Sequence, residues 1–107
     1  MAVLKRLEEK FGDRPVSELV YEDGNAKVVR FYLRGGQEIK PHTSPSSVFI
    51  TVLKGKVAFY APQGELEAEA GSTVFYEPNE PHGFKALEDA VLEAVITPKP
   101  SVKPPAL

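Results

Sequence analysis

Turn-forming residues divide the chain from Val16 onward into short runs that are rich in strand-forming residues. Glycine reaches positive φ without strain and proline presets φ for a turn, so each cluster of these residues marks a physical break. The breaks fall at 23–25, 35–36, 44–47, 55–56, 62–64, 71, 78–81 and 88–89. They predict about nine strands, at 16–22, 26–34, 37–42, 48–54, 57–61, 65–70, 73–76, 82–87 and 90–97. Strands of this length and spacing are typical of an all-β sandwich or barrel, not of a sheet with crossover helices.

Two of the predicted strands differ in how their faces should be covered. Residues 65–70 alternate Glu with Leu or Ala, which predicts one acidic, solvated face and one buried face. Residues 48–53 are largely apolar on both faces, with Phe49 and Leu53 on the same side. A second sheet can cover one face, and the other needs the N-terminal segment or a second copy of the chain. We therefore expect a homodimer, with the chain's own N-terminal segment as the alternative cover.

The two ends of the chain differ from the middle. Leu4, Leu7 and Phe11 follow a helical i, i+3, i+7 spacing, and Gly12 stands where a helix cap is favoured. This pattern predicts a short N-terminal helix or arm over 1–15, followed by a barrel domain over 16–97. Residues 98–107 hold four of the ten prolines, and we expect an extended tail there.

Composition excludes several classes of function. The 13 basic and 15 acidic residues give a net charge of −2 with no basic run, so a nucleic-acid partner is not expected. The chain has no cysteine, which removes disulfides, thiolate metal sites and cysteine nucleophiles. No apolar stretch is long enough to span a membrane, and charges come too early for a signal peptide. We expect a cytoplasmic protein with no membrane partner.

Only two histidines are present, and each lies next to a predicted turn. His42 follows Gly36 after five residues and precedes the strand that is apolar on both faces, and His82 follows Pro81 at the start of a later strand. A histidine at a strand end is more often hydrogen-bonded into the wall than a metal ligand, so neither carries a function alone.

Taken together, these blocks resemble a small single-domain cupin over about residues 26–97. The first motif of that family reads G-x5-H-x-H-x3,4-E-x6-G, and Gly36, His42 and Gly55 stand at the matching places. The second motif ends in a histidine after a proline-rich turn, as do Pro81 and His82. The resemblance implies an all-β fold: a double-stranded β-helix (cupin or jelly-roll) barrel, here with a short N-terminal helix.

The resemblance also implies an interior metal site, of which this chain keeps half. His42 and His82 match two of the family's ligands, whereas Ser44 stands at the second histidine of the first motif and Val48 at its glutamate. The implied cofactor is a divalent metal (Zn, Fe, Mn, Ni or Cu), weakly held or absent, because two imidazoles leave most of the shell open.

Three carboxylates are candidates to complete the metal site. Glu38 shares strand parity with His42 if the register is regular, and Glu77 and Glu80 lie near His82 in the turn. Each is more often solvated than ligating.

The same two imidazoles can instead form a pocket for a small ligand without metal. Ser44, Val48, Tyr76 and Phe84 are the expected pocket residues, with Phe75 as a further aromatic neighbour. Simple core packing is the competing explanation for the aromatic residues.

Three functions follow from these alternatives. The first is a metal-dependent enzyme, dioxygenase-like or isomerase-like, acting on a small organic molecule. The second is a metal-poor ligand-binding or sensing module without catalysis, and the third is a structural barrel. No residue is assigned a catalytic role, and whether the chain is an enzyme stays open.

Overall fold

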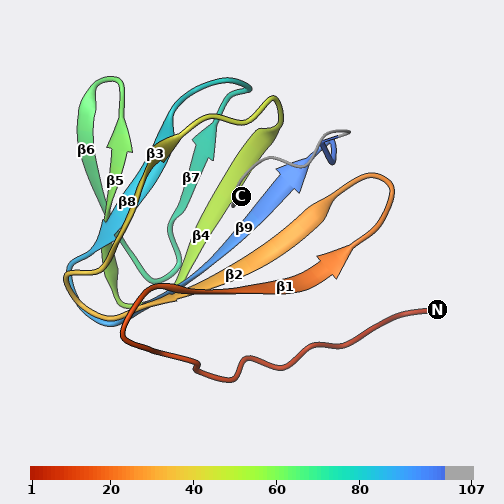
Figure 1. Cartoon of the computed structure of the whole chain (residues 1–107), viewed down its shortest axis with the longest axis horizontal. Coiled ribbons are helices and arrows are strands. Elements are labelled where there is room, and N and C mark those ends of the chain that lie inside the picture. The colour runs from red at the N-terminus through yellow and green to blue at the C-terminus, as the bar shows by residue number, and fades with distance from the viewer. Residues whose placement is uncertain (101–107) are drawn as a thin grey trace.

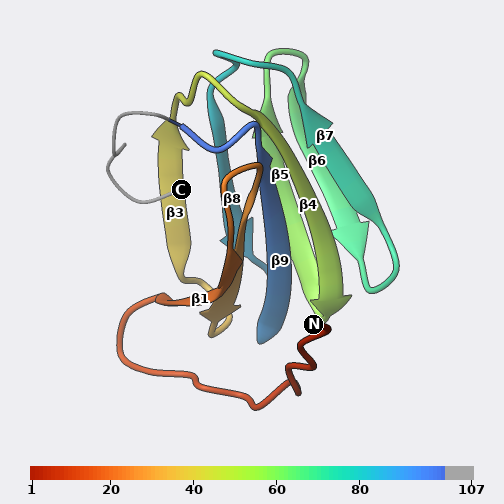
Figure 2. The same ribbon diagram turned by 90° about the vertical axis from the view of Figure 1, so that its right-hand side faces the viewer.

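The computed structural model describes residues 1–100 and places nine strands in two facing sheets (Figures 1 and 2). The strands are β1 (Val16–Glu22), β2 (Lys27–Leu33), β3 (Glu38–His42), β4 (Ser47–Lys54), β5 (Lys56–Ala61), β6 (Gly64–Glu69), β7 (Thr73–Tyr76), β8 (His82–Ala86) and β9 (Ala90–Thr97). Each lies within one residue, at either end, of the strand predicted from the turn residues. The all-β prediction is confirmed.

One sheet has five strands in the order β1-β2-β9-β4-β7, and the other has four in the order β3-β8-β5-β6. All pairings are antiparallel, and each sheet turns one face toward the other. The core between them includes the fully buried Phe59, Phe84, Ile50 and Leu92. The acidic alternation of β6 also behaves as predicted, because its three glutamates are exposed while Ala68 is buried.

The predicted N-terminal helix is wrong. Residues 1–12 form no regular element but an arm that lies on the outer face of the five-stranded sheet. An isolated helix of about ten residues is marginal in water unless one face is buried. Here Leu4 and Leu7 stay exposed, and only Phe11 of the expected stripe is partly buried.

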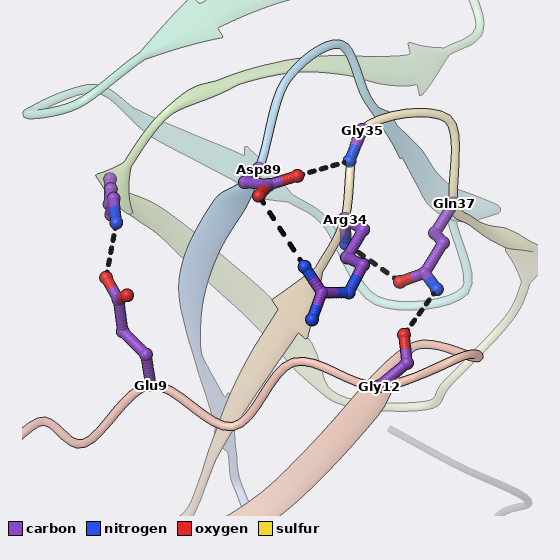
Figure 3. Close-up of polar contacts among 7 residues, drawn as sticks. Glu9, Gly12, Arg34, Gly35, Gln37 and Asp89 are labelled. Atoms are coloured by element: carbon purple, nitrogen blue, oxygen red, sulfur yellow. Dashed lines mark hydrogen bonds and ion pairs between the residues drawn. The ribbon is translucent and has the colours of Figure 1, made fainter.

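Side chains of the barrel hold this arm at several separate points. The Arg6 carbonyl accepts from Arg30, and the Gly12 carbonyl accepts from the side chain of Gln37 (Figure 3). Glu9 pairs with Lys54, and Lys10 pairs with Glu18 at 2.7 Å. Anchors spread along the arm favour an extended strap, since a helix would draw them together.

Phe11 makes the main apolar contact of the arm. Its ring meets Tyr32 edge-on with 6.2 Å between centroids, and the guanidinium of Arg34 lies 5.5 Å from its centroid. Tyr32 is fully buried although it points away from the core, so the arm is what covers it.

The predicted extended tail over 98–107 lies mostly outside the described residues, because the description ends at 100. Ahead of that point, Lys99 pairs with Glu22 at 3.0 Å. Over residues 1–100 the chain contains no helix, so none is available there to cross a bilayer.

We expect Phe11→Ala to lower the free energy of unfolding by about 1–2 kcal/mol, because it uncovers Tyr32 and removes an aromatic pair. Urea unfolding followed by circular dichroism measures this. Leu87→Ala is the matched control, since Leu87 is 44% exposed in the β8–β9 turn and should change stability by less than about 0.5 kcal/mol. Equal effects of the two substitutions would show that the arm does not stabilise the sheet.

Candidate functional site

The two histidines face each other because β3 contains a bulge. β3 and β8 pair regularly at Ile39 and Phe84, but the register then shifts by one residue and His42 stands opposite His82. Ile39 packs against the core, so strict alternation would turn residue 41 inward and His42 outward. The extra residue reverses that alternation beyond the bulge, so that His42 lies on the inner side.

Gly83 makes room for the bulge. A Cβ placed on Gly83 would lie 2.7 Å from the Ile39 carbonyl oxygen and from the Pro41 nitrogen, and 2.9 Å from the Lys40 carbonyl carbon. All three are backbone atoms, so no side-chain rotation can relieve the contact. A glycine inside a strand often marks such a close backbone approach. Sequence reasoning missed Gly83, although a glycine directly after a strand-end histidine was the available signal.

The two imidazole rings lie against each other, with 4.5 Å between centroids and 59° between planes. His82 is 1% exposed, and His42 is partly buried. His42 Nδ1 lies 3.0 Å from the Lys40 carbonyl, and His82 Nδ1 lies 3.2 Å from the Glu80 carbonyl. Because a carbonyl only accepts, both Nδ1 atoms act as donors, and in the tautomer that carries its proton there, Nε2 is an acceptor.

Neither Nε2 has a hydrogen-bond partner among residues 1–100, and both atoms are buried. Burial lowers the pKa of His82, and the neighbouring His42 lowers it further, although the hydrogen bond to Glu80 acts in the opposite direction. His82 is therefore neutral at pH 7. A buried acceptor without a donor costs about 1–3 kcal/mol, so this arrangement suits a cation or a hydrogen-bond donor that both atoms can share.

Tyr76 forms one wall of the site. Its ring centroid lies 5.5 Å from that of His82. Its hydroxyl donates to the Tyr60 carbonyl at 2.7 Å, and burial raises the pKa of this phenol to about 12. The Tyr76 ring therefore contacts the site, whereas its hydroxyl is hydrogen-bonded to the barrel wall.

The other predicted pocket residues are also on inner positions of the barrel. Val48 is 1% exposed and pairs directly with Tyr76 across β4 and β7. Phe84 follows His82 by two residues on the same face and packs between Phe31 and Phe59, at 5.5 and 5.6 Å between centroids. Its contacts are those of a core residue. Phe75, in contrast, points outward and is 69% exposed, so it does not line the interior.

Ser44 is buried in the loop between β3 and β4, where its contacts hold the loop. Its hydroxyl oxygen accepts the Ser46 N–H at 3.2 Å, and its carbonyl accepts the Asn79 N–H at 2.7 Å. Ser46 is buried as well, and its hydroxyl donates to the Pro98 carbonyl at 2.6 Å. The bond to Asn79 ties the β3–β4 loop to the β7–β8 loop, and the bond to Pro98 ties it to the residue that follows β9.

The three candidate carboxylates do not join the histidines. The bulge separates Glu38 from the inner face, and its carboxylate instead accepts from the Tyr60 hydroxyl at 2.6 Å. Glu80 accepts the Glu77 N–H at 2.7 Å within the turn, and Glu77 is exposed. Across residues 1–100, no group of three or more His, Asp or Glu side chains is placed to hold a metal ion.

Comparisons with known proteins agree with this architecture. The cupin domain family model matches residues 29–98. No curated protein matches the chain.

Among solved structures, an RmlC-like cupin protein from Desulfovibrio desulfuricans is 32% identical with a TM-score of 0.83, over 92% of this chain and 97% of that one. A Thermus thermophilus protein is 24% identical with a TM-score of 0.81, over 94% and 98% of the two chains. A conserved protein of unknown function from Streptococcus pyogenes is 25% identical with a TM-score of 0.74, over 83% and 78%.

We expect Gly83→Ala to destabilise the protein by about 1–3 kcal/mol, since the added methyl group would meet three backbone atoms of β3 at less than 3 Å. Urea unfolding measures the change. Gly24→Ala is the matched control, because a Cβ at Gly24 meets nothing within 4 Å. A Gly83→Ala protein as stable as Gly24→Ala would contradict the close approach of β3.

We expect the free energy of unfolding of the metal-free protein, measured in the presence of a chelator, to fall as the pH drops from 7.5 to 5.5. Because the pKa of His82 is lowered on folding, the unfolded chain binds the proton more readily below about pH 6.5, and folding loses at most about 1.4 kcal/mol per pH unit. His42 on β3 and Tyr76 on β7 are the titratable groups whose rings pack against His82. Thermal unfolding of His82→Asn, which keeps a donor near Glu80, should show a shallower dependence. An unchanged slope would argue against a buried neutral His82.

Proposed function

Since the chain belongs to the cupin domain family, we propose that it binds a divalent transition metal between His42 and His82 and uses it on a small organic molecule. The observation that carries this proposal is the pair of buried Nε2 lone pairs. Each ring donates its Nδ1–H to a backbone carbonyl. Metal-ligating histidines commonly have such a hydrogen bond at the nitrogen that does not bind the metal.

The donor set fits two positions of a metal's shell. Imidazole nitrogen suits Zn, Cu, Fe and Ni. Ser44 and Val48, at the positions of the missing donors, do not complete the set, because Ser44 is neutral and engaged in its loop and Val48 has no donor atom. A site with two protein ligands holds its ion weakly and leaves most of the shell to water or to an organic ligand.

A bound metal would supply Lewis acidity or an oxygen-binding centre to an isomerase-like or dioxygenase-like reaction. The chain's own groups would set the surroundings of that centre. His82 stays neutral and available at pH 7 because burial lowers its pKa. The Tyr76 ring lies beside His82, and the buried Val48 pairs with Tyr76, so one side of the site is apolar.

Metal-free binding of a small ligand is the second candidate, and the replacement of two expected donors by Ser44 and Val48 favours it. Against it, both Nε2 atoms are inaccessible to solvent. An ion is smaller than an organic molecule, so it needs less rearrangement of the surrounding loops to reach these enclosed atoms.

We expect Zn²⁺ or Ni²⁺ to raise the melting temperature of the chelator-stripped protein, and His42→Ala and His82→Ala each to weaken binding at least tenfold. Calorimetric titration measures the affinity, and an ion at 100 times its Kd adds about 2.7 kcal/mol of stability. Ser44→Ala is the matched control and should bind as the parent does. Ser44→His should bind more tightly, because it restores a donor at the family's position.

Equal binding by the parent and by the double variant His42→Ala/His82→Ala would overturn the metal proposal. A small metabolite that stabilises the parent in chelator, and fails to stabilise this double variant, would establish the metal-free alternative.

A further inference from the structure

An apolar groove lies on the outer side of the four-stranded sheet, at the end of the sheet where the histidines stand. Its hollow of about 430 Å³ is lined by Pro41 of β3, Tyr60 and Ala61 of β5, Pro62 just after β5 and Pro81 just before β8. Tyr60 faces outward, because it alternates with Phe59, which is fully buried in the core. We name these five lining residues the proline groove, since three of them are prolines.

The side chains of the proline groove recognise shape and not hydrogen-bonding groups. Proline and alanine side chains carry no donor or acceptor, and the Tyr60 hydroxyl already donates to Glu38 at 2.6 Å. That hydrogen bond raises the pKa of Tyr60 to about 12, so its phenol stays neutral at pH 7. Grooves lined by aromatic and apolar side chains are used to bind proline-rich segments, because such a segment already holds a polyproline II conformation before it binds.

The rim of the groove next to Tyr60 is acidic. Glu65 stands opposite Tyr60 in the β5–β6 register, and it contributes with Glu38 to the raised pKa of the phenol. Lys85 stands opposite Glu38, whereas Glu65 has no lysine opposite it and forms no ion pair with any of residues 1–100. The occupant that complements this groove is therefore a proline-rich segment that also carries a basic residue.

A segment of this composition follows β9 in the same chain. Residues 98–107 read Pro-Lys-Pro-Ser-Val-Lys-Pro-Pro-Ala-Leu, of which the structure describes the first three. We propose that residues 101–107 occupy the proline groove of their own chain. The pair Pro104–Pro105 then lies against Tyr60, and Lys103 lies beside Glu65.

The chain is anchored close enough to the groove for this contact. The Pro98 carbonyl accepts from the Ser46 hydroxyl at 2.6 Å. Ser46 stands five residues after Pro41, so the α-carbons of these two residues lie at most about 18 Å apart. A polyproline II segment from Pro98 to Pro105 spans about 22 Å. The same anchor favours the groove of the same chain over that of another copy, because a short tether gives an effective concentration of about millimolar magnitude.

Disulfide trapping in the full chain tests the contact, and the natural chain contains no cysteine to interfere. We expect Pro62→Cys/Ala106→Cys to form a disulfide within one chain under mild oxidation at micromolar concentration. Leu87→Cys/Ala106→Cys is the matched control and should link poorly, because Leu87 is 44% exposed but follows the opposite end of β8 from Pro81. Mass spectrometry of the non-reduced protein separates links within a chain from links between chains. Equal linking in the two pairs, or links formed only between chains, would overturn the proposal.

Substitutions within the segment test its chemistry in the same Pro62→Cys/Ala106→Cys background. We expect Lys103→Glu, and separately Pro104→Gly/Pro105→Gly, to slow linking by about fivefold or more, because the first brings like charges together and the second removes the preformed conformation. Ser101→Ala is the matched control and should link at the parent rate. If neither substitution slowed the reaction, the segment would be reaching Pro62 as an unspecific tether, and recognition by the groove would be excluded.

Discussion

The close approach of the β3 backbone to Gly83 determines everything else at the interior site. It permits the extra residue at Lys40–Pro41, and that residue turns His42 inward instead of outward. The bulge also places the Lys40 carbonyl within 3.0 Å of His42 Nδ1, so one irregularity fixes both the position of the ring and its tautomer. In the β7–β8 loop, the Glu80 carbonyl does the same for His82. The site is therefore built from backbone geometry more than from neighbouring side chains.

Two imidazoles that each donate an Nδ1–H to a backbone carbonyl form a chemically selective site. The two Nε2 atoms can accept but cannot donate, so they favour a cation or a donor group and disfavour an anion. Burial and the second ring both lower the pKa of His82. Protonation of its Nε2 is therefore disfavoured, so a bound cation or donor is the better partner for that atom. The apolar wall made by Val48 and the Tyr76 ring acts in the same direction, because apolar surroundings disfavour a charged imidazolium.

Turn chemistry was enough to predict the strands, because glycine and proline act locally and mark the same breaks in the sequence and in the fold. The histidine pair was also predictable from the family's motif. Local patterns failed where tertiary contacts decide: Leu4, Leu7 and Phe11 have helical spacing, yet the arm follows scattered anchors such as Arg30 and Gln37. Strict strand alternation placed Glu38 on the same face as His42. That expectation was wrong, because the β3 bulge lies between the two residues and cannot be read from an alternating pattern. One set of outer-face neighbours could not be predicted either, because its members meet only through the register of four strand pairs: Tyr21, Val28, Val95, Phe49 and Phe75.

The interior site and the outer face of the five-stranded sheet share two strands, which connects them physically. In β4, Val48 faces the core and Phe49 the outer face, and in β7, Tyr76 lies beside His82 while Phe75 is 69% exposed on the outer face. β7 is a four-residue strand at the sheet's edge, hydrogen-bonded to β4 alone in its sheet. Such a short edge strand is among the easiest parts of a fold to open locally. A contact that held Phe75 on the outer face would therefore also restrain β7 and, through the adjacent residue, the Tyr76 ring beside the histidines.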